Sequence, residues 1–231
     1  MEEPLRRIIV VLVALFALSA VWATPVLGAE AYRISAKQVG VSADAFWESC
    51  QEDTPEVGQT TCEFVSIFAF EGRSVFRESG SPPIRQGGIA CVSHDVTDEF
   101  GAPVSVETGC AEDFVFTYAT DLSSASLSAT MPVETLVCTE TPEGVFCEPG
   151  GGELRDVAVS ATWNAVGPPT KFRDRFVSHT ETEGFECVFK QSGRGVRTDA
   201  VATAMVDGVD LGESAFASLT EGTFKFLDRC R

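Results

Sequence analysis

The sequence predicts an all-β fold, built as two tandem disulfide-stapled antiparallel β units that are sandwich- or barrel-like and follow a signal peptide. Three observations predict it. Short runs rich in Val, Ile, Phe and Thr alternate with breaks of Gly, Pro, Ser and Asp. Eight cysteines, an even number, are spread along the chain. Finally, one set of sequence landmarks occurs twice in the same order.

The N-terminus has the layout of a secretory signal. Arg6 and Arg7 precede an apolar run over Ile8–Trp22, and small residues follow it. We expect residues 1–29 to be a signal peptide with cleavage near Ala23 or Ala29. A retained N-terminal anchor is the alternative, although the run is shorter than the ~20 residues that a membrane span needs. The mature chain is therefore expected to be secreted or extracytoplasmic, with no membrane span.

Strands are expected along the whole mature chain. Val157, Val159, Ala161 and Trp163 share one face of a period-2 pattern, which indicates a half-buried strand. For Ser42–Ser49 a short helical turn is the alternative. The expected strands are 32–37, 63–70, 88–96, 103–107, 113–120, 133–139, 156–163, 171–179, 185–190, 196–206 and 223–228.

An internal duplication organises these strands. Each copy contains Cys, Thr-Pro-Glu, Cys, Pro-Pro, Cys and Asp-Leu in that order. The matched positions are Cys50 with Cys138, Cys62 with Cys147, Pro82 with Pro168, Cys91 with Cys187, and Asp121 with Asp210. The repeat predicts a first β unit over residues 30–130 and a second over 131–231. Whether the two units are separate domains or share one core is left open.

The repeat also predicts the disulfides. In both copies the Thr-Pro-Glu turn separates two cysteines, so Cys50–Cys62 and Cys138–Cys147 are expected to clamp two hairpins. Cys91 and Cys187 correspond to one another, so each is expected to bond within its own copy. This reasoning gives the pairs Cys91–Cys110 and Cys187–Cys230. Since no C-x2-C spacing occurs, a metal-binding role for the cysteines is the weaker reading.

Few residues are arranged for catalysis, so an enzyme is the less favoured class. The two histidines are His94 and His179. In a strand, Ser93 and Asp95 point away from His94, so these neighbours do not form a catalytic triad. The hydrolase elbow G-x-S-x-G, the zinc motif H-E-x-x-H and the phosphate loop G-K-[ST] do not occur in the sequence. We predict no catalytic residues and no cofactor.

Carboxylates offer one metal hypothesis. Asp207, Asp210 and Glu213 follow at a spacing of three in a Gly-containing segment, and oxygen-rich loops of this kind can bind Ca²⁺. An ordinary acidic turn is the alternative. Asp95, Asp98 and Glu99 form a second acidic cluster.

The net charge of −17 argues against binding to nucleic acid or to anionic membranes. The expected function is therefore that of an exported non-enzymatic β protein with a binding or cell-envelope role, whose partner is an extracellular protein or polymer. Two alternatives stay open. One is a carboxylate-based extracellular hydrolase resembling a glycosidase, and the other is an inhibitor-like module that presents a disulfide-clamped loop. The sequence does not predict the ligand or the oligomeric state.

Overall fold

The computed structural model confirms the all-β fold. It describes residues 32–53, 59–98, 103–141, 144–149, 154–182 and 185–230, and its regular elements there are all strands of one antiparallel sheet. The predicted signal peptide lies outside these residues. The strands are β1 (Tyr32–Asp53), β2 (Gln59–Glu78), β3 (Ile84–Gln86), β4 (Ile89–Thr97), β5 (Pro103–Ala111), β6 (Phe114–Tyr118), β7 (Ser124–Thr141), β8 (Gly144–Pro149), β9 (Arg155–Ala165), β10 (Thr170–Thr182), β11 (Phe185–Val206), β12 (Val209–Glu213) and β13 (Phe216–Cys230).

Eight of the strands close into a cylinder. The pairings run β1-β13-β11-β9-β7-β5-β4-β2, and β2 also pairs with β1, which completes the ring. The other five strands add to this ring at its margins, with β6 and β8 on β7, β10 and β12 on β11, and β3 on β2. The ring itself therefore has no open edge, whereas β3 and β10 each pair with one neighbouring strand.

The interior of the cylinder is packed with apolar side chains. Trp163 and Met131 are fully buried there, together with small residues such as Ala43 and Ala202, which leave room for the large rings. The indole N–H of Trp163 crosses from β9 to donate to the carbonyl oxygen of Asp44 on β1 at 3.0 Å. This hydrogen bond satisfies the one polar atom of the buried ring.

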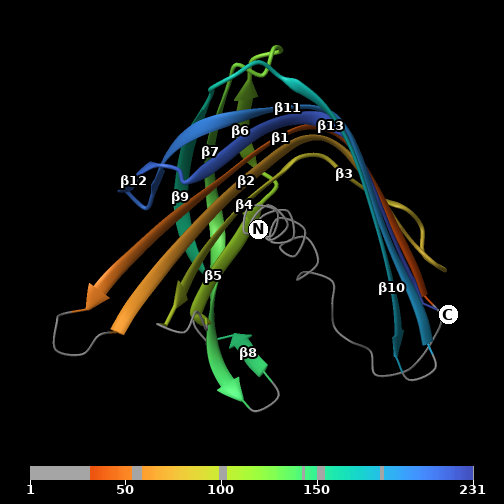
Figure 1. Cartoon of the computed structure of the whole chain (residues 1–231), viewed down its shortest axis with the longest axis horizontal. Coiled ribbons are helices and arrows are strands. Elements are labelled where there is room, and N and C mark those ends of the chain that lie inside the picture. The colour runs from red at the N-terminus through yellow and green to blue at the C-terminus, as the bar shows by residue number, and fades with distance from the viewer. Residues whose placement is uncertain are drawn as a thin grey trace, which may run out of the picture.

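A row of four glycines divides the longest strands into two segments. Gly72, Gly40, Gly222 and Gly195 are neighbours in register on β2, β1, β13 and β11. A Cβ on Gly40 would lie 2.1 Å from the carbonyl oxygen of Glu71, and one on Gly195 would lie 2.0 Å from that of Glu221. Only glycine allows backbones to approach so closely, and glycine in a strand marks a tight bend. Figure 1 shows these strands arching over the top of the molecule.

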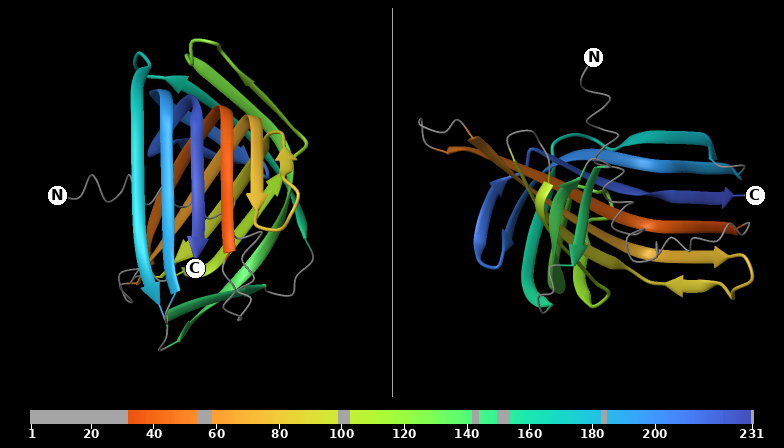
Figure 2. Two further views of the ribbon diagram at one scale, coloured as in Figure 1. Left: turned by 90° about the vertical axis from the view of Figure 1, so that its right-hand side faces the viewer. Right: turned by 90° about the horizontal axis from the view of Figure 1, so that it is seen from below.

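The glycine row separates two regions, which we name the body and the arm. The body contains the cylinder. The arm consists of β3, β10 and the strand segments on the other side of the row. In Figure 2 the six strands of the arm lie side by side in the order β10, β11, β13, β1, β2 and β3. The arm segments of the long strands are residues 32–39, 73–78, 185–194 and 223–230.

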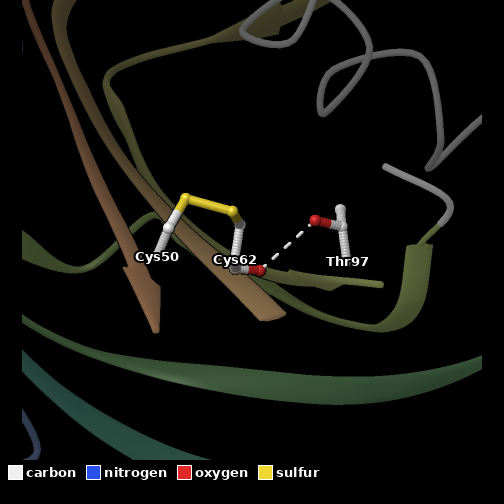
Figure 3. The surroundings of a disulfide bond; sticks show 3 residues. All are labelled: Cys50, Cys62 and Thr97. Carbon is white, nitrogen blue, oxygen red and sulfur yellow. Dashed lines mark hydrogen bonds between the residues drawn. A yellow bond between two sulfur atoms is a disulfide. The ribbon is translucent and has the colours of Figure 1, made fainter. Parts of the chain in front are cut away.

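Three of the predicted disulfides are present, namely Cys50–Cys62, Cys91–Cys110 and Cys138–Cys147. Each joins two residues that face one another directly in register across a strand pair. Figure 3 shows the first, where the hydroxyl of Thr97 also donates to the carbonyl oxygen of Cys62. Cys187 is also disulfide-bonded, and its register partner is Cys230, whose side chain lies outside the described residues.

The structure differs from some of the predicted local elements. The helical alternative for Ser42–Ser49 is wrong, because this segment lies inside β1. Residues 185–190 and 196–206 are one strand, β11, since Gly193 and Gly195 mark a bend and not a turn. The predicted boundary between residues 130 and 131 falls inside β7, and one core contains residues of both predicted units. The tandem repeat itself stays a prediction.

Candidate binding surfaces

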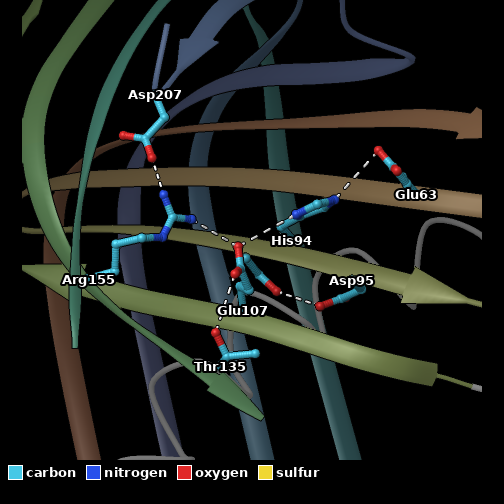
Figure 4. Close-up of polar contacts among 8 residues, drawn as sticks. Glu63, His94, Asp95, Glu107, Thr135, Arg155 and Asp207 are labelled. Carbon is cyan, nitrogen blue, oxygen red and sulfur yellow. Dashed lines mark hydrogen bonds and ion pairs between the residues drawn. The ribbon is translucent and has the colours of Figure 1, made fainter. Parts of the chain in front are cut away.

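A collar of polar side chains lines one rim of the cylinder (Figure 4). Glu63, His94 and Arg155 each lie two positions from a buried core valine on the same strand, so they share the interior face of the wall. The collar residues come from β2, β4, β5, β7, β9 and the β11–β12 turn, and they are Glu63, His94, Glu107, Thr135, Arg155 and Asp207.

Glu107 lies at the centre of the collar. Its carboxylate is 3.2 Å from the guanidinium of Arg155 and 3.8 Å from Nδ1 of His94, and it accepts a hydrogen bond from Thr135. Arg155 also pairs with Asp207, and Nε2 of His94 lies 3.7 Å from Glu63. Each carboxylate of the collar thus lies within 4 Å of the guanidinium of Arg155 or the imidazole of His94.

The neighbours of His94 behave as the sequence predicts. The hydroxyl of Ser93 donates to the carboxylate of Asp95 at 2.7 Å, while His94 points the other way to Glu107. Burial raises the pKa of Asp95, and the hydrogen bond from Ser93 opposes this rise. His94 lies in the body, whereas His179 lies on β10 in the arm. The two histidines therefore belong to different regions.

The three carboxylates of the calcium hypothesis lie around β12. Asp207 and Gly208 have φ values of 51° and 80° and form the two-residue turn between Val206 and Val209, a type I′ pattern that the Asp-Gly pair favours. Asp207 accepts from the backbone N–H of Ala158, and Asp210 accepts from that of Gly212. Among the described residues no group of three His, Cys, Asp or Glu side chains is placed to hold a metal ion. The calcium site stays a prediction.

One face of the arm is apolar and rich in phenylalanine. The ring of Phe189 lies 5.2 Å from that of Phe226 and 6.0 Å from that of Phe176. Phe172 and Phe224 stack at 5.9 Å across Gly193, where a Cβ would lie only 3.1 Å from Phe224. Register and the alternation of side chains place nine apolar residues on this aromatic face: Ile34, Ala36, Phe76, Ile84, Phe172, Phe176, Phe189, Phe224 and Phe226.

The opposite face of the arm is basic. The same alternation places 12 of the chain's 17 Lys and Arg residues there, and ten of these are exposed. We call this surface the basic face. Its residues are Arg33 and Lys37 on β1, Arg73 and Arg77 on β2, Arg85 on β3, Lys171, Arg173 and Arg175 on β10, Lys190 and Arg194 on β11, and Lys225 and Arg229 on β13.

The basic face carries like charges directly opposite one another. Arg33 faces Arg229, Lys37 faces Lys225, and Arg173 faces Arg194 across neighbouring strands. Like charges in such pairs destabilise a sheet. Among the residues that the structure describes, no ion pair joins a carboxylate to any of the twelve. Glu186 lies on the same face of β11 as Lys190 and Arg194, so the face carries an excess of positive charge and not positive charge alone.

A half-buried carboxylate lies where the aromatic face continues onto the body. Asp44 accepts a hydrogen bond from the hydroxyl of Ser218 at 2.7 Å. Burial raises the pKa of Asp44 from 3.8 to about 6, while the Ser218 hydrogen bond and the charge of Arg197 act in the opposite direction. Arg197 stacks over Phe172 and donates to Thr220. The charge of Asp44 is thus costly in the folded protein.

Sequence reasoning missed the basic face, although the sequence contains a signal for it. In Lys171-Phe172-Arg173-Asp174-Arg175-Phe176 the basic and aromatic residues alternate, and Phe224-Lys225-Phe226 repeats the pattern on β13. A period of two places the two kinds of side chain on opposite faces of a strand. The net charge of −17 describes the whole chain and gives no information about how Lys and Arg are distributed between the two faces of a strand.

Three disulfides in one chain are typical of proteins that fold in an oxidising or extracellular environment. Within the described residues, none of the elements is a helix with the length and apolar character needed to cross a membrane. No protein-family model, curated protein or solved structure matches the chain.

Proposed function

We propose that this chain is an exported, non-enzymatic binding protein of the cell envelope, and that the basic face of the arm binds an anionic partner. The observation that carries the proposal is the segregation of 12 of 17 Lys and Arg residues onto one face of a single-layer sheet. Solubility does not require this face, since the chain as a whole has a charge of −17. Opposed pairs such as Lys37 and Lys225 reduce stability, and an anionic partner would relieve their repulsion.

The other regions of the molecule support other functions less well. The interior of the body is filled by its own side chains, including Trp163 and Met131. In the collar, Glu107 is held by Arg155 and His94, which leaves the hydrolase alternative without a free pair of carboxylates there. For the inhibitor alternative, Pro55 and Pro142 lie outside the described residues.

Binding to a soluble polyanion tests the proposal. Sodium polyphosphate serves as the probe, and Lys171→Gln, Arg173→Gln and Arg175→Gln are combined on β10, where all three residues are exposed. The wild-type protein is expected to bind with an affinity that falls steeply as salt is raised, and the triple variant is expected to bind about tenfold more weakly or worse, because fewer phosphate contacts form. Isothermal titration at several salt concentrations measures both effects.

A control variant changes the net charge equally on the body. Thr120→Glu, Ser128→Glu and Thr130→Glu also lower the net charge by three, at exposed positions outside the arm. If the control lost as much affinity as the β10 variant, only the overall charge would matter and the assignment to the basic face would be wrong. Absence of binding to any anionic probe would overturn the proposed function itself.

A further inference from the structure

We infer that the open edge of β10 binds an extended acidic segment of another protein, which adds to the arm as an antiparallel strand. This inference rests on the proposed function and names the partner as a polypeptide in which carboxylates alternate with mainly apolar side chains. The contact is made at the edge of the sheet, so the partner does not have to enter the concave side of the bent strands.

Among the described strands, β10 combines length with an open edge. It has 13 residues and pairs with β11 alone, and Figure 2 shows it as the outermost strand of the arm. The other strands with one partner, β3, β6, β8 and β12, have three to six residues each. Short edge strands protect a sheet against pairing with another chain, whereas a long edge strand presents a row of unpaired backbone groups. The edge of β10 is therefore the one best suited to accept a further strand.

The direction of the backbone groups of β10 follows from its neighbour β11. The carbonyl oxygen of Asp199 on β11 accepts from the backbone N–H of Val166, which lies between β9 and β10. Successive residues of a strand direct their backbone groups to opposite sides, so the odd-numbered residues of β11 point toward β10. The register pairs them with even-numbered residues of β10, such as Phe172 and Asp174. The odd-numbered residues of β10 therefore direct their N–H and C=O groups outward.

These outward backbone groups belong to the basic residues of β10. Lys171, Arg173 and Arg175 are odd-numbered, and all three are exposed. In an added antiparallel strand, the residue opposite each of them would exchange two backbone hydrogen bonds with it and place its Cβ atom about 5 Å away on the basic face. A carboxylate at that position forms a favourable pair of opposite charges. Three acidic residues at alternate positions thus match the three cations.

The aromatic face specifies the residues between the carboxylates. Phe172 and Phe176 lie on this side of β10, and Phe176 is 56% exposed. Aromatic rings pair favourably with β-branched or aromatic side chains across neighbouring strands, so apolar residues are expected opposite them. Asp174 lies between the two rings in sequence, and a polar residue such as threonine fits opposite it. The partner segment therefore alternates acidic with mainly apolar side chains.

The charge of β10 disfavours a second copy of the same edge as the partner. In an antiparallel pair of β10 strands centred on Arg173, Lys171 would face Arg175 and the two Arg173 residues would face one another. Like charges directly opposite one another destabilise a sheet, and basic residues on edge strands protect proteins against such self-pairing. An acidic segment meets no such repulsion. The same three cations thus oppose self-association and select the partner.

Labelled synthetic peptides test the inference on the full chain. The probe is the heptapeptide Glu-Val-Glu-Thr-Glu-Val-Glu, and fluorescence anisotropy measures its binding. One derivative carries N-methyl groups on the amides of its two central Glu residues, and the other carries them on the amides of its two Val residues. Only the Glu amides face β10 in the antiparallel arrangement. Because each backbone hydrogen bond adds about two- to tenfold to affinity, the first derivative should bind at least about tenfold more weakly, whereas the second should keep the affinity of the parent peptide.

A matched pair of variants tests the edge of the protein itself. Arg173→Gln and Arg173→Pro remove the same charge, but proline also removes the outward N–H. Beyond the loss shown by the Gln variant, the Pro variant is expected to bind the heptapeptide severalfold more weakly, because a backbone hydrogen bond is lost. The two variants should bind polyphosphate equally. Thermal denaturation checks that the Pro variant folds, and the methylated peptides decide the question with the wild-type chain if it does not.

The outcomes distinguish this inference from the proposed function. Equal affinity for the two methylated peptides, or a loss confined to the Val derivative, would overturn antiparallel strand addition and leave the proposed function standing if polyphosphate binds. Dimerisation of the chain that Arg173→Pro abolishes would identify a second copy as the occupant of the edge and would also overturn the inference. Binding to neither polyphosphate nor the heptapeptide would overturn both.

Discussion

The body and the arm are built from the same strands, yet they use the period-2 pattern differently. In the body the sheet closes, so one set of alternate side chains forms a buried core. In the arm the sheet stays a single layer, and alternate side chains form an aromatic face and a basic face. Alternation thus fixes which residues share a face, whereas closure of the sheet packs one such face into a continuous apolar core in the body.

The strand β13 shows this contrast within one element. Leu219, in its body segment, is fully buried, whereas Leu227, in its arm segment, is half-buried among the residues of the basic face. The two leucines are separated by Gly222 of the glycine row. They lie on the same side of the strand, and Leu219 packs in the closed core whereas Leu227 does not.

The greatest loss of stability is expected from a substitution in the core of the body. Leu219→Ala should lower the free energy of unfolding by about 3–4 kcal/mol, because it opens a cavity in a closed core. Leu227→Ala should lower it by less than about 1 kcal/mol, since no comparable cavity forms. Urea denaturation of the two variants measures the difference. Equal losses would mean that the arm is as tightly packed as the body.

The next effect concerns the junction of the two regions. Gly195→Ala places a Cβ against the backbone of Glu221, so the free energy of unfolding should fall by about 2–3 kcal/mol. The matched control is Gly87→Ala, where an added Cβ meets no atom within 4 Å. Thermal denaturation compares the two variants, and small-angle scattering reports the angle between arm and body. A Gly195 variant with wild-type stability and shape would show that the glycine row does not define the bend.

The smallest effect depends on pH and involves Asp44. Its pKa is about 6 in the folded protein and 3.8 ordinarily, so the folded state holds the proton more tightly than the unfolded chain does. Stability is therefore lost as the pH rises from about 4 to 6 and stays lower above that range. Asp44→Asn should match the wild type near pH 4 and be more stable by about 1–2 kcal/mol near pH 8, after allowance for partial exposure. Denaturation curves at the two pH values test this, and a variant that is less stable at pH 8 would contradict the assigned cause.

Part of the candidate surface could have been predicted from the alternating Lys, Arg and Phe residues of β10 and β13. The strand identity of 171–179 and 223–228 was predicted, and with it the two faces of each strand. What could not be predicted is that six strands place their basic faces side by side. That outcome depends on register, and on pairs far apart in sequence such as β1 with β13.

The all-β class and the partners in three disulfides could be predicted from the amino-acid sequence, because they follow from patterns of alternation, turns and cysteine spacing. Closure of the sheet, its bend at four glycines and the gathering of positive charge on one face of the arm depend on pairing between strands that are far apart in the sequence. Gly195 lies between the expected strands 185–190 and 196–206, where the sequence predicts a break. It is part of a bend because it stands in register with Gly222, Gly40 and Gly72, and register between distant strands is set by the packing of the whole sheet.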